Sequence, residues 1–204
     1  ENGVEVNSGR MNLGVVTVNL PRIALESEGD MNKFWEIFNE RMNIAEDALV
    51  YRVERTKEAT PANAPILYQY GAFGRRLGKD ESVDQLFKNR RATVSLGYIG
   101  LYEVATVFFG NSWEHNPEAK EFTLDIIRDM KRRVEEWSDQ YGYHFSIYST
   151  PSESLTDRFC RLDTEKFGSI PDITDKEYYT NSFHYDVRKN PTPFEKLDFE
   201  KAYP

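Results

Sequence analysis

Cysteine is almost missing from this sequence: Cys160 is the only one among 204 residues. A single cysteine excludes an internal disulfide and any multi-cysteine metal site within the chain, which fits a reducing cytosol and a cytoplasmic location. The only histidines, His115, His144 and His184, lie far apart and form no HExxH pair. We therefore expect no metal site here, and we interpret Cys160 and His184 as structural residues rather than as a nucleophile and a base.

Positive charge and long apolar runs are also scarce. The net charge is −8, so a surface that coats nucleic acid is not expected, although a small anionic ligand needs only a local positive site. No apolar run is long enough for a membrane span, and no signal segment opens the chain. The glycine pairs Gly97/Gly100 and Gly71/Gly74 lack the rest of a P-loop or dinucleotide fingerprint.

The composition is otherwise that of a globular protein. Hydrophobic residues make up 39% and aromatic residues 14%, enough for one sizeable core or two small ones. The opening Glu1-Asn2-Gly3 resembles the middle of a turn and has no initiator methionine. We therefore expect a piece of a longer protein.

Strand patterns alternate with helix patterns along the chain. A buried strand is predicted at residues 13–20, an alternating strand that ends in glycines at 92–100, and a strand or extended segment at 66–70. Long helices are predicted from a cap at Asp30 to about Glu58 and from a cap at Asn116 to about Tyr141, with shorter helices at 83–88 and 101–109. Beyond Gly168 we expect irregular structure and a tail that is mostly loop. This order indicates an α/β fold with largely parallel pairing.

Residues 148–155 form the central segment. They follow an alternating run at 145–148 and precede a helical pattern that continues past Cys160. Thr150 would be the N-cap, Pro151 the first helical residue and Glu153 the partner in a capping box. Because free amides at a helix start attract anions, and ligands sit where strands run into helices, this segment is a candidate site. A purely structural cap explains the same spacing.

A second candidate arrangement consists of acidic groups. Asp163 and Glu165 lie close to Glu153 in sequence, which makes a two-carboxylate hydrolase conceivable. Such pairs are frequent in an acidic chain, so this pattern carries little weight.

Five segments in fixed order carry a family resemblance. They are GRMNLGVVTVNLPRIA at 9–24, SLGYIG at 95–100, YSTPSESL at 148–155, DRFCRLD at 157–163 and YYTNSFH at 178–184. Together they resemble the catalytic subunit of anaerobic (class III) ribonucleoside-triphosphate reductases, which are glycyl-radical enzymes. The resemblance covers essentially the whole chain and implies that residues 1–204 are part of a single ten-stranded α/β barrel domain.

The resemblance also implies an activity. Such enzymes reduce ribonucleoside triphosphates to 2′-deoxyribonucleoside triphosphates by glycyl and thiyl radical chemistry, with formate as the reductant in the best-known subgroup. It further implies nucleotide effectors, a homodimer, and a radical-SAM iron–sulfur activating enzyme as partner.

Specific residues take roles through this resemblance. Asn12 resembles an active-site asparagine that hydrogen-bonds a ribose hydroxyl or the reductant, and Glu153 resembles a glutamate that relays a proton beside the ribose. Ser149, Thr150 and Ser152 would bind substrate, with the helix-start amides as phosphate ligands.

Several parts of the family pattern have no match in these residues. They are the thiyl-radical cysteine, the radical glycine, the four-cysteine structural zinc site and the regulatory region. We expect the chain alone to be inactive and do not assign the missing role to Cys160. Two alternatives stay open: a sister glycyl-radical enzyme acting on a small acid or polyol, and a non-catalytic binding or scaffold module.

Overall fold

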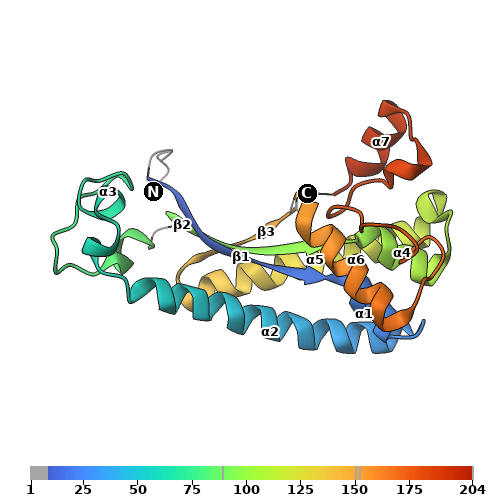
Figure 1. Cartoon of the computed structure of the whole chain (residues 1–204), viewed down its shortest axis with the longest axis horizontal. Helices are drawn as coiled ribbons and strands as arrows, with labels where there is room; N and C mark the ends of the chain where they lie inside the picture. Colours follow the sequence, from blue (N-terminus) through green and yellow to red (C-terminus); the bar gives the residue numbers. More distant parts are fainter. Residues whose placement is uncertain (1–8, 89, 150, 152, 204) are drawn as a thin grey trace. The chain divides into compact units, whose positions relative to one another are not determined.

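Three parallel strands form one sheet in the order β1-β2-β3. The computed structural model describes residues 9–88, 90–149, 151 and 153–203, except for the side chain of residue 153. The strands are β1 (Met11–Asn19), β2 (Ala92–Ile99) and β3 (His144–Tyr148). Figure 1 shows that each strand leads into a helix at its carboxyl end. The predicted α/β class with parallel pairing is confirmed.

The helices that follow the strands are α1 (Leu20–Glu26), α4 (Leu101–Phe109) and α6 (Glu153–Phe167). Two long helices, α2 (Met31–Lys57) and α5 (Pro117–Tyr141), lie between successive strands in the sequence. Parallel strands need such crossover connections, because a short hairpin can join only antiparallel neighbours.

Both long helices begin at their predicted caps. The Asp30 carboxylate accepts the backbone N–H of Asn32 at 2.8 Å, and the Asn116 side chain accepts that of Glu118 at 2.9 Å. These bonds satisfy amides that have no partner inside the helix. The faces predicted from the helical period are buried, namely Phe34, Phe38, Met42, Ala45 and Leu49 on α2 and Phe122, Ile126, Met130, Val134 and Trp137 on α5.

The chain divides into two compact units. Unit 1 comprises Glu1–Val16, Ile44–Leu96 and Lys131–Ile147, and unit 2 comprises Thr17–Asn43, Gly97–Met130 and Tyr148–Pro204. In unit 2, a buried cluster of Ile99, Cys160, Ile173 and Tyr179 joins the end of β2 to α6 and to the chain beyond it.

Burial differs between the strands. In the central strand β2 every residue but Thr93 is buried, whereas in β1 only Val18 is buried. The predicted first strand is present, but the prediction that it is buried is wrong for most of its residues. In the described sheet β1 has a neighbour on one side only, so less of its surface is covered.

Two other predictions of local structure are corrected. Residues 66–70 are not a strand, because Pro65 starts a short helix, α3 (Pro65–Tyr68), whose Pro65 carbonyl accepts the N–H of Gln69 at 2.8 Å. Proline is well suited to a first helical position. The short helix expected at 83–88 is a 3-10 helix, Val83–Leu86, and further 3-10 turns occupy Pro61–Asn63, Trp113–His115 and Val187–Lys189.

The tail is not mostly loop, because α7 spans Pro193–Glu200. Its start is a capping box: Thr192 Oγ1 accepts the N–H of Glu195 at 3.3 Å, and the Glu195 carboxylate accepts the N–H of Thr192 at 2.8 Å. Threonine, proline and glutamate hold the same relative positions here as at residues 150–153. The sequence prediction used this signature at residues 150–153 but not at residues 192–195.

Candidate functional site

The carboxyl end of β1 is fixed by a buried acid. Asp163 on α6 accepts hydrogen bonds from Asn19 Nδ2 at 3.1 Å and from the Tyr179 hydroxyl at 2.7 Å, and it pairs with the Arg22 guanidinium. Burial, and then the Asp163 charge, raise the pKa of Tyr179. Asp163 therefore ties the strand end, α1 and α6 together.

This arrangement contradicts the two-carboxylate hydrolase. Asp163 is fully buried, whereas the Glu165 side chain is 60% exposed and pairs with Arg161 at 3.0 Å. A hydrolytic pair needs both groups facing one substrate. Asp163 and Glu165 instead serve packing and surface charge.

The end of β3 carries the predicted substrate residue Ser149. Its hydroxyl lies 3.3 Å from the Tyr98 hydroxyl, near the end of β2. Burial raises the pKa of Tyr98 to about 12, and the hydrogen bond with Ser149 opposes that rise. The tyrosine remains a neutral partner that fixes the orientation of Ser149.

The helix after Ser149 begins later than predicted. Pro151 is exposed and not helical, and α6 starts at Glu153. Thr150 and Ser152 lie outside the described residues, as does any cap that they make. The fixed φ of proline suits extended backbone as well as a first helical turn, so its presence alone does not place the helix start. The 15-residue helix α6 therefore has Glu153 as its first residue.

Asn12 lies near the start of β1, in unit 1. Its Nδ2 donates to Ser95 Oγ at 3.0 Å, and its Oδ1 accepts the N–H of Gly14 at 2.8 Å. Both ends of the amide are thereby oriented while the residue stays exposed. Because a primary amide has two N–H donors and two acceptor lone pairs, Asn12 retains capacity for a ligand.

The predicted site residues are divided between the two units. Ser149 and Glu153 belong to unit 2 and Asn12 to unit 1, so each half of the predicted site is described by itself.

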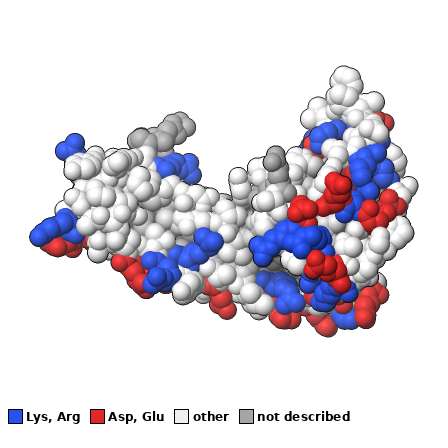
Figure 2. All heavy atoms as spheres, in the orientation of Figure 1, with Lys and Arg blue, Asp and Glu red and all other residues white. Residues whose placement is uncertain are grey.

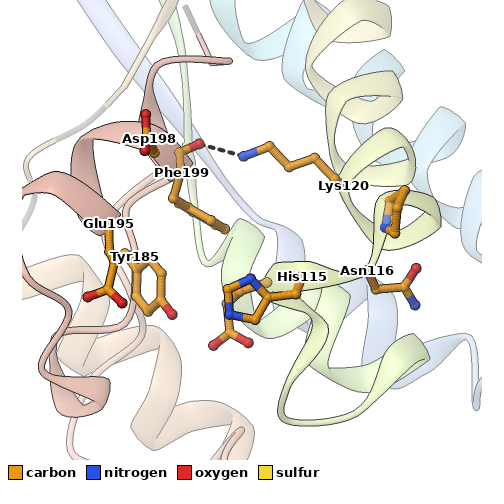
Figure 3. A pocket seen from close by; sticks show the side chains of 9 residues that line it. His115, Asn116, Lys120, Tyr185, Glu195, Asp198 and Phe199 are labelled. Carbon is orange, nitrogen blue, oxygen red and sulfur yellow. Dashed lines mark hydrogen bonds between the residues drawn. The ribbon is translucent and has the colours of Figure 1, made fainter.

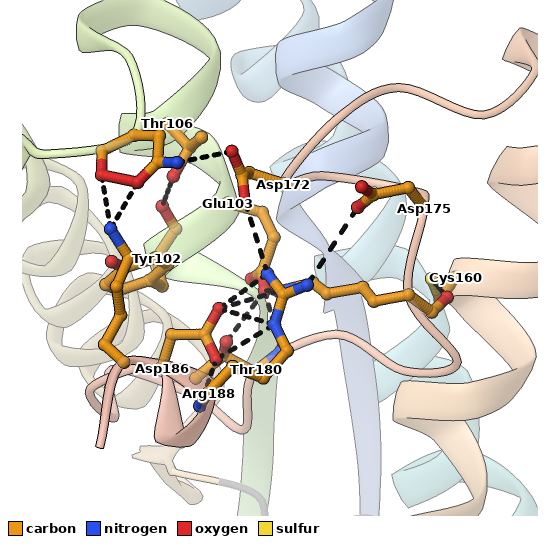
Figure 4. Close-up of polar contacts among 12 residues, drawn as sticks. Tyr102, Glu103, Thr106, Cys160, Asp172, Asp175, Thr180, Asp186 and Arg188 are labelled. Atoms are coloured by element: carbon orange, nitrogen blue, oxygen red, sulfur yellow. Dashed lines mark hydrogen bonds and ion pairs between the residues drawn. The ribbon is translucent and has the colours of Figure 1, made fainter. Parts of the chain in front are cut away.

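A buried polar network was missed from the sequence (Figure 4). Glu103 on α4 is fully buried, pairs with Lys176, and accepts both the N–H of Thr180 at 3.0 Å and its hydroxyl at 2.7 Å. Lys176 also lies 3.4 Å from Asp186. Burial would raise the pKa of Asp186, but Arg188 and Lys176 lower it below its ordinary range. The sequence does contain one indication of this network, because Glu103 is the single charged residue in the apolar run Leu101–Phe109.

Cys160 lies next to this network and is a buried thiol, as predicted. Its Sγ donates to the Lys176 carbonyl at 3.0 Å. Burial raises the pKa of Cys160 to about 11. Since the thiolate is the reactive form, this position is a poor nucleophile.

We expect Cys160 to react with iodoacetamide at least about 100-fold more slowly in the native protein than in urea, because both the thiolate fraction and access are reduced. The measurement is mass spectrometry of the tryptic peptide that contains Cys160 after timed labelling at pH 8. Equal labelling rates in native and unfolded protein would contradict the buried assignment.

Described residues of unit 2 line two cavities. The larger, about 460 Å³, lies between the start of α5 and α7 (Figure 3). Its polar groups hold helix ends: Asn116 caps α5, Glu195 caps α7, and Lys120 donates to the Phe199 carbonyl. We assign this cavity to the packing of α7.

The smaller cavity, about 310 Å³, lies beside the first turns of α6. Thr156, Asp157, Glu177, Tyr178 and Asn181 line it.

The histidines and the surface charges make separate local contacts. His184 Nδ1 lies 3.0 Å from the Glu200 carboxylate, and burial together with Arg90 and Arg10 lowers the pKa of His144. Within the described ranges, no three His, Cys, Asp or Glu side chains could share a metal ion. Figure 2 shows positive and negative side chains intermixed around α1 and α6, where Arg161 pairs with Glu165 and Lys166 with Glu26.

None of the helices in the described part of the chain combines the length and apolar character needed to cross a bilayer.

Parallel strands that run into helices at their carboxyl ends define an α/β protein, and in this class ligands usually bind at the strand ends. The chain belongs to the anaerobic ribonucleoside-triphosphate reductase family, whose model matches residues 1–204. It is 49% identical over 207 residues to the reductase of Salmonella typhimurium and 49% identical over 205 residues to that of Escherichia coli. Both matches include 100% of this chain and 29% of the relative.

A solved structure is similar in fold. The anaerobic ribonucleotide reductase from Thermotoga maritima in complex with dATP and CTP matches with a TM-score of 0.71 and 25% identity, over 94% of this chain and 32% of that one. This likeness agrees with the prediction that the chain is part of an α/β barrel of the ribonucleotide reductase type.

Proposed function

We propose that these residues are part of the single catalytic barrel of an enzyme that reduces ribonucleoside triphosphates to 2′-deoxyribonucleoside triphosphates without oxygen. The family match over residues 1–204 carries this proposal. The chain spans 29% of the length of its curated relatives, so the activity is that of the longer protein. Family membership argues against both the sister glycyl-radical enzyme and the scaffold module.

Asn12 would orient the ribose or the reductant. The Asn12 amide donates one N–H to Ser95 and accepts the N–H of Gly14 with one lone pair. These two bonds hold the amide in a fixed plane. Its second N–H and second lone pair suit a ribose hydroxyl or a formate oxygen, each of which can be hydrogen-bonded by an amide. A pre-oriented amide costs little side-chain entropy when the ligand binds.

Ser149 and the start of α6 would hold the phosphates. The free backbone amides of the first turn and the helix dipole attract anions, and the Ser149 hydroxyl lies at the end of the preceding strand. Thr150 and Ser152 are proposed as further phosphate ligands on the basis of the sequence. Glu153 would move a proton at the ribose, since a carboxylate can accept and return one.

The remaining participants lie outside these residues. A glycyl radical, installed by a radical-SAM iron–sulfur activating enzyme, would supply the one-electron chemistry, with formate as reductant. We also propose a structural zinc site elsewhere in the longer protein, a homodimer, nucleotide effectors and a cytoplasmic location. The Thermotoga maritima complex with dATP and CTP supports nucleotides as substrate and effector.

Asn12→Ala tests the ribose assignment in the activated full-length protein. We expect kcat/KM for the nucleoside triphosphate to fall about tenfold or more, because a hydrogen bond to the reacting sugar is lost. Ser95→Ala, which only releases the amide, should give a smaller loss. Asn43→Ala changes an exposed asparagine on α2 and serves as control. Wild-type kcat/KM in Asn12→Ala would remove Asn12 from the site.

A further inference from the structure

Residues 178–182 are fastened to the junction of β2 and α4. The N–H of Gly100 donates to the Thr180 carbonyl at 2.9 Å, and the N–H of Leu101 donates to the Ser182 carbonyl at 3.1 Å. Ile99 and Asn181 form an antiparallel bridge. The backbone of this segment is therefore set by the sheet itself.

Two buried carboxylates fix the inward side chains of the segment. Tyr179 is fully buried and donates to Asp163, and Thr180 donates to Glu103. Tyr178, in contrast, is 44% exposed and lines the smaller cavity together with Asn181. The cavity wall is thus held rigidly by contacts on its far side, which favours precise positioning of a ligand.

The smaller cavity lies close to the proposed phosphate site. The N–H of Tyr179 donates to the Thr156 carbonyl at 3.2 Å, which holds the segment against α6. Thr156 follows Glu153 by three residues, a little less than one helical turn of about 3.6 residues. A ligand whose phosphates sit at the start of α6 can therefore reach this cavity.

The lining chemistry excludes the phosphates themselves. Asp157 and Glu177 contribute carboxylates, and neither lysine nor arginine is among the lining residues. Carboxylates repel phosphate but accept hydrogen bonds from amino and hydroxyl groups. A volume of about 310 Å³ is at the small end of the range for ligand pockets, so the cavity suits one part of a nucleotide rather than the whole.

We propose that Tyr178 forms the subsite for the base of the nucleoside triphosphate, with its ring as a stacking surface in the cavity that Asn181 also lines. Aromatic side chains stack on all four bases, because every base has a flat π face. This inference rests on the proposed function, since it deepens the same site.

The test compares ligands with and without a base in the full-length protein. For Tyr178→Ala we expect the Kd for CTP to rise about tenfold or more, because a stacking contact is lost. The Kd for inorganic tripolyphosphate should not change. Tyr178→Phe keeps the ring and should bind CTP like wild type, whereas Tyr178→Leu keeps bulk without the ring and should bind weakly. Tyr51→Ala removes another exposed tyrosine, on α2, and should have no effect.

Three results would overturn the subsite. If the wild-type protein binds and reduces CTP and Tyr178→Ala binds CTP equally well, the subsite is rejected and the proposed function is retained. Equal loss of CTP and tripolyphosphate binding shows that the effect is not on the base. A wild-type protein that neither binds nor reduces any nucleoside triphosphate rejects the proposed function and the subsite together.

Discussion

Replacing Lys176 by methionine in the full-length protein is expected to lower the free energy of unfolding by about 3–5 kcal/mol, the usual cost of removing one partner from a buried ion pair. The Lys176 side chain is 5% exposed and the Glu103 side chain 0%. Methionine fills a similar volume, so the loss reports the charge rather than a cavity. In the Lys176→Met variant, residues 176–186 should unfold locally before the rest of the chain.

The Glu103 carboxylate cannot find a substitute partner nearby. Its Oε1 already accepts from Thr180, and its Oε2 is buried with no hydrogen-bond partner among the residues that the structure describes. Removing Lys176 leaves this negative charge with neutral donors alone. An uncompensated buried charge is costly because the interior screens it poorly.

Urea unfolding and hydrogen exchange at the Thr180 amide measure the effect, since that amide is protected by Glu103 itself. Lys201→Met serves as control, because the Lys201 side chain is 65% exposed and pairs with Asp198 only at the surface. Its cost should stay within about 0.5 kcal/mol. Adding Glu103→Gln to Lys176→Met should restore part of the stability, because glutamine still accepts from Thr180 without a charge. Equal effects of Lys176→Met and Lys201→Met would show that the pair is not buried in the working protein.

Local patterns predicted the elements whose causes are local. The periods of α2 and α5 and the caps Asp30 and Asn116 lie within a few residues of what they determine, and the structure confirms them. The start of α7 has an equally local cause in its capping box, so it was within reach of the sequence. The same signature precedes α6, where Pro151 is not helical, so the signature predicts a helix but does not fix its first residue.

The contacts that orient the site residues join positions that are far apart in the sequence. Asn12 is oriented by Ser95, 83 residues away, and Asp163 by Arg22 and Asn19, 141 and 144 residues away. No periodicity links such residues, since they meet only when the strands pair. Asp163 could therefore be noticed as an acid but not recognised as a buried anchor.

Glu153→Gln is expected to lower kcat of the activated full-length enzyme by about 10²–10⁴-fold, the typical contribution of a general acid or base. Glutamine has almost the shape of glutamate and cannot exchange a proton at neutral pH. It also serves in a capping box as well as glutamate does. A glutamate that only caps or faces the helix dipole would thus cost about 1 kcal/mol of stability at most and leave kcat unchanged.

The two roles of Glu153 can therefore be separated in one set of measurements. The melting temperature and the glycyl radical signal in electron paramagnetic resonance should match wild type in Glu153→Gln, while product formation is lost. Glu165→Gln is the matched control, because it makes the same change on the same helix at a side chain that is 60% exposed. Its kcat should equal that of wild type. Full turnover in Glu153→Gln would assign Glu153 to the helix start alone, and the proton at the ribose would have to move through another group.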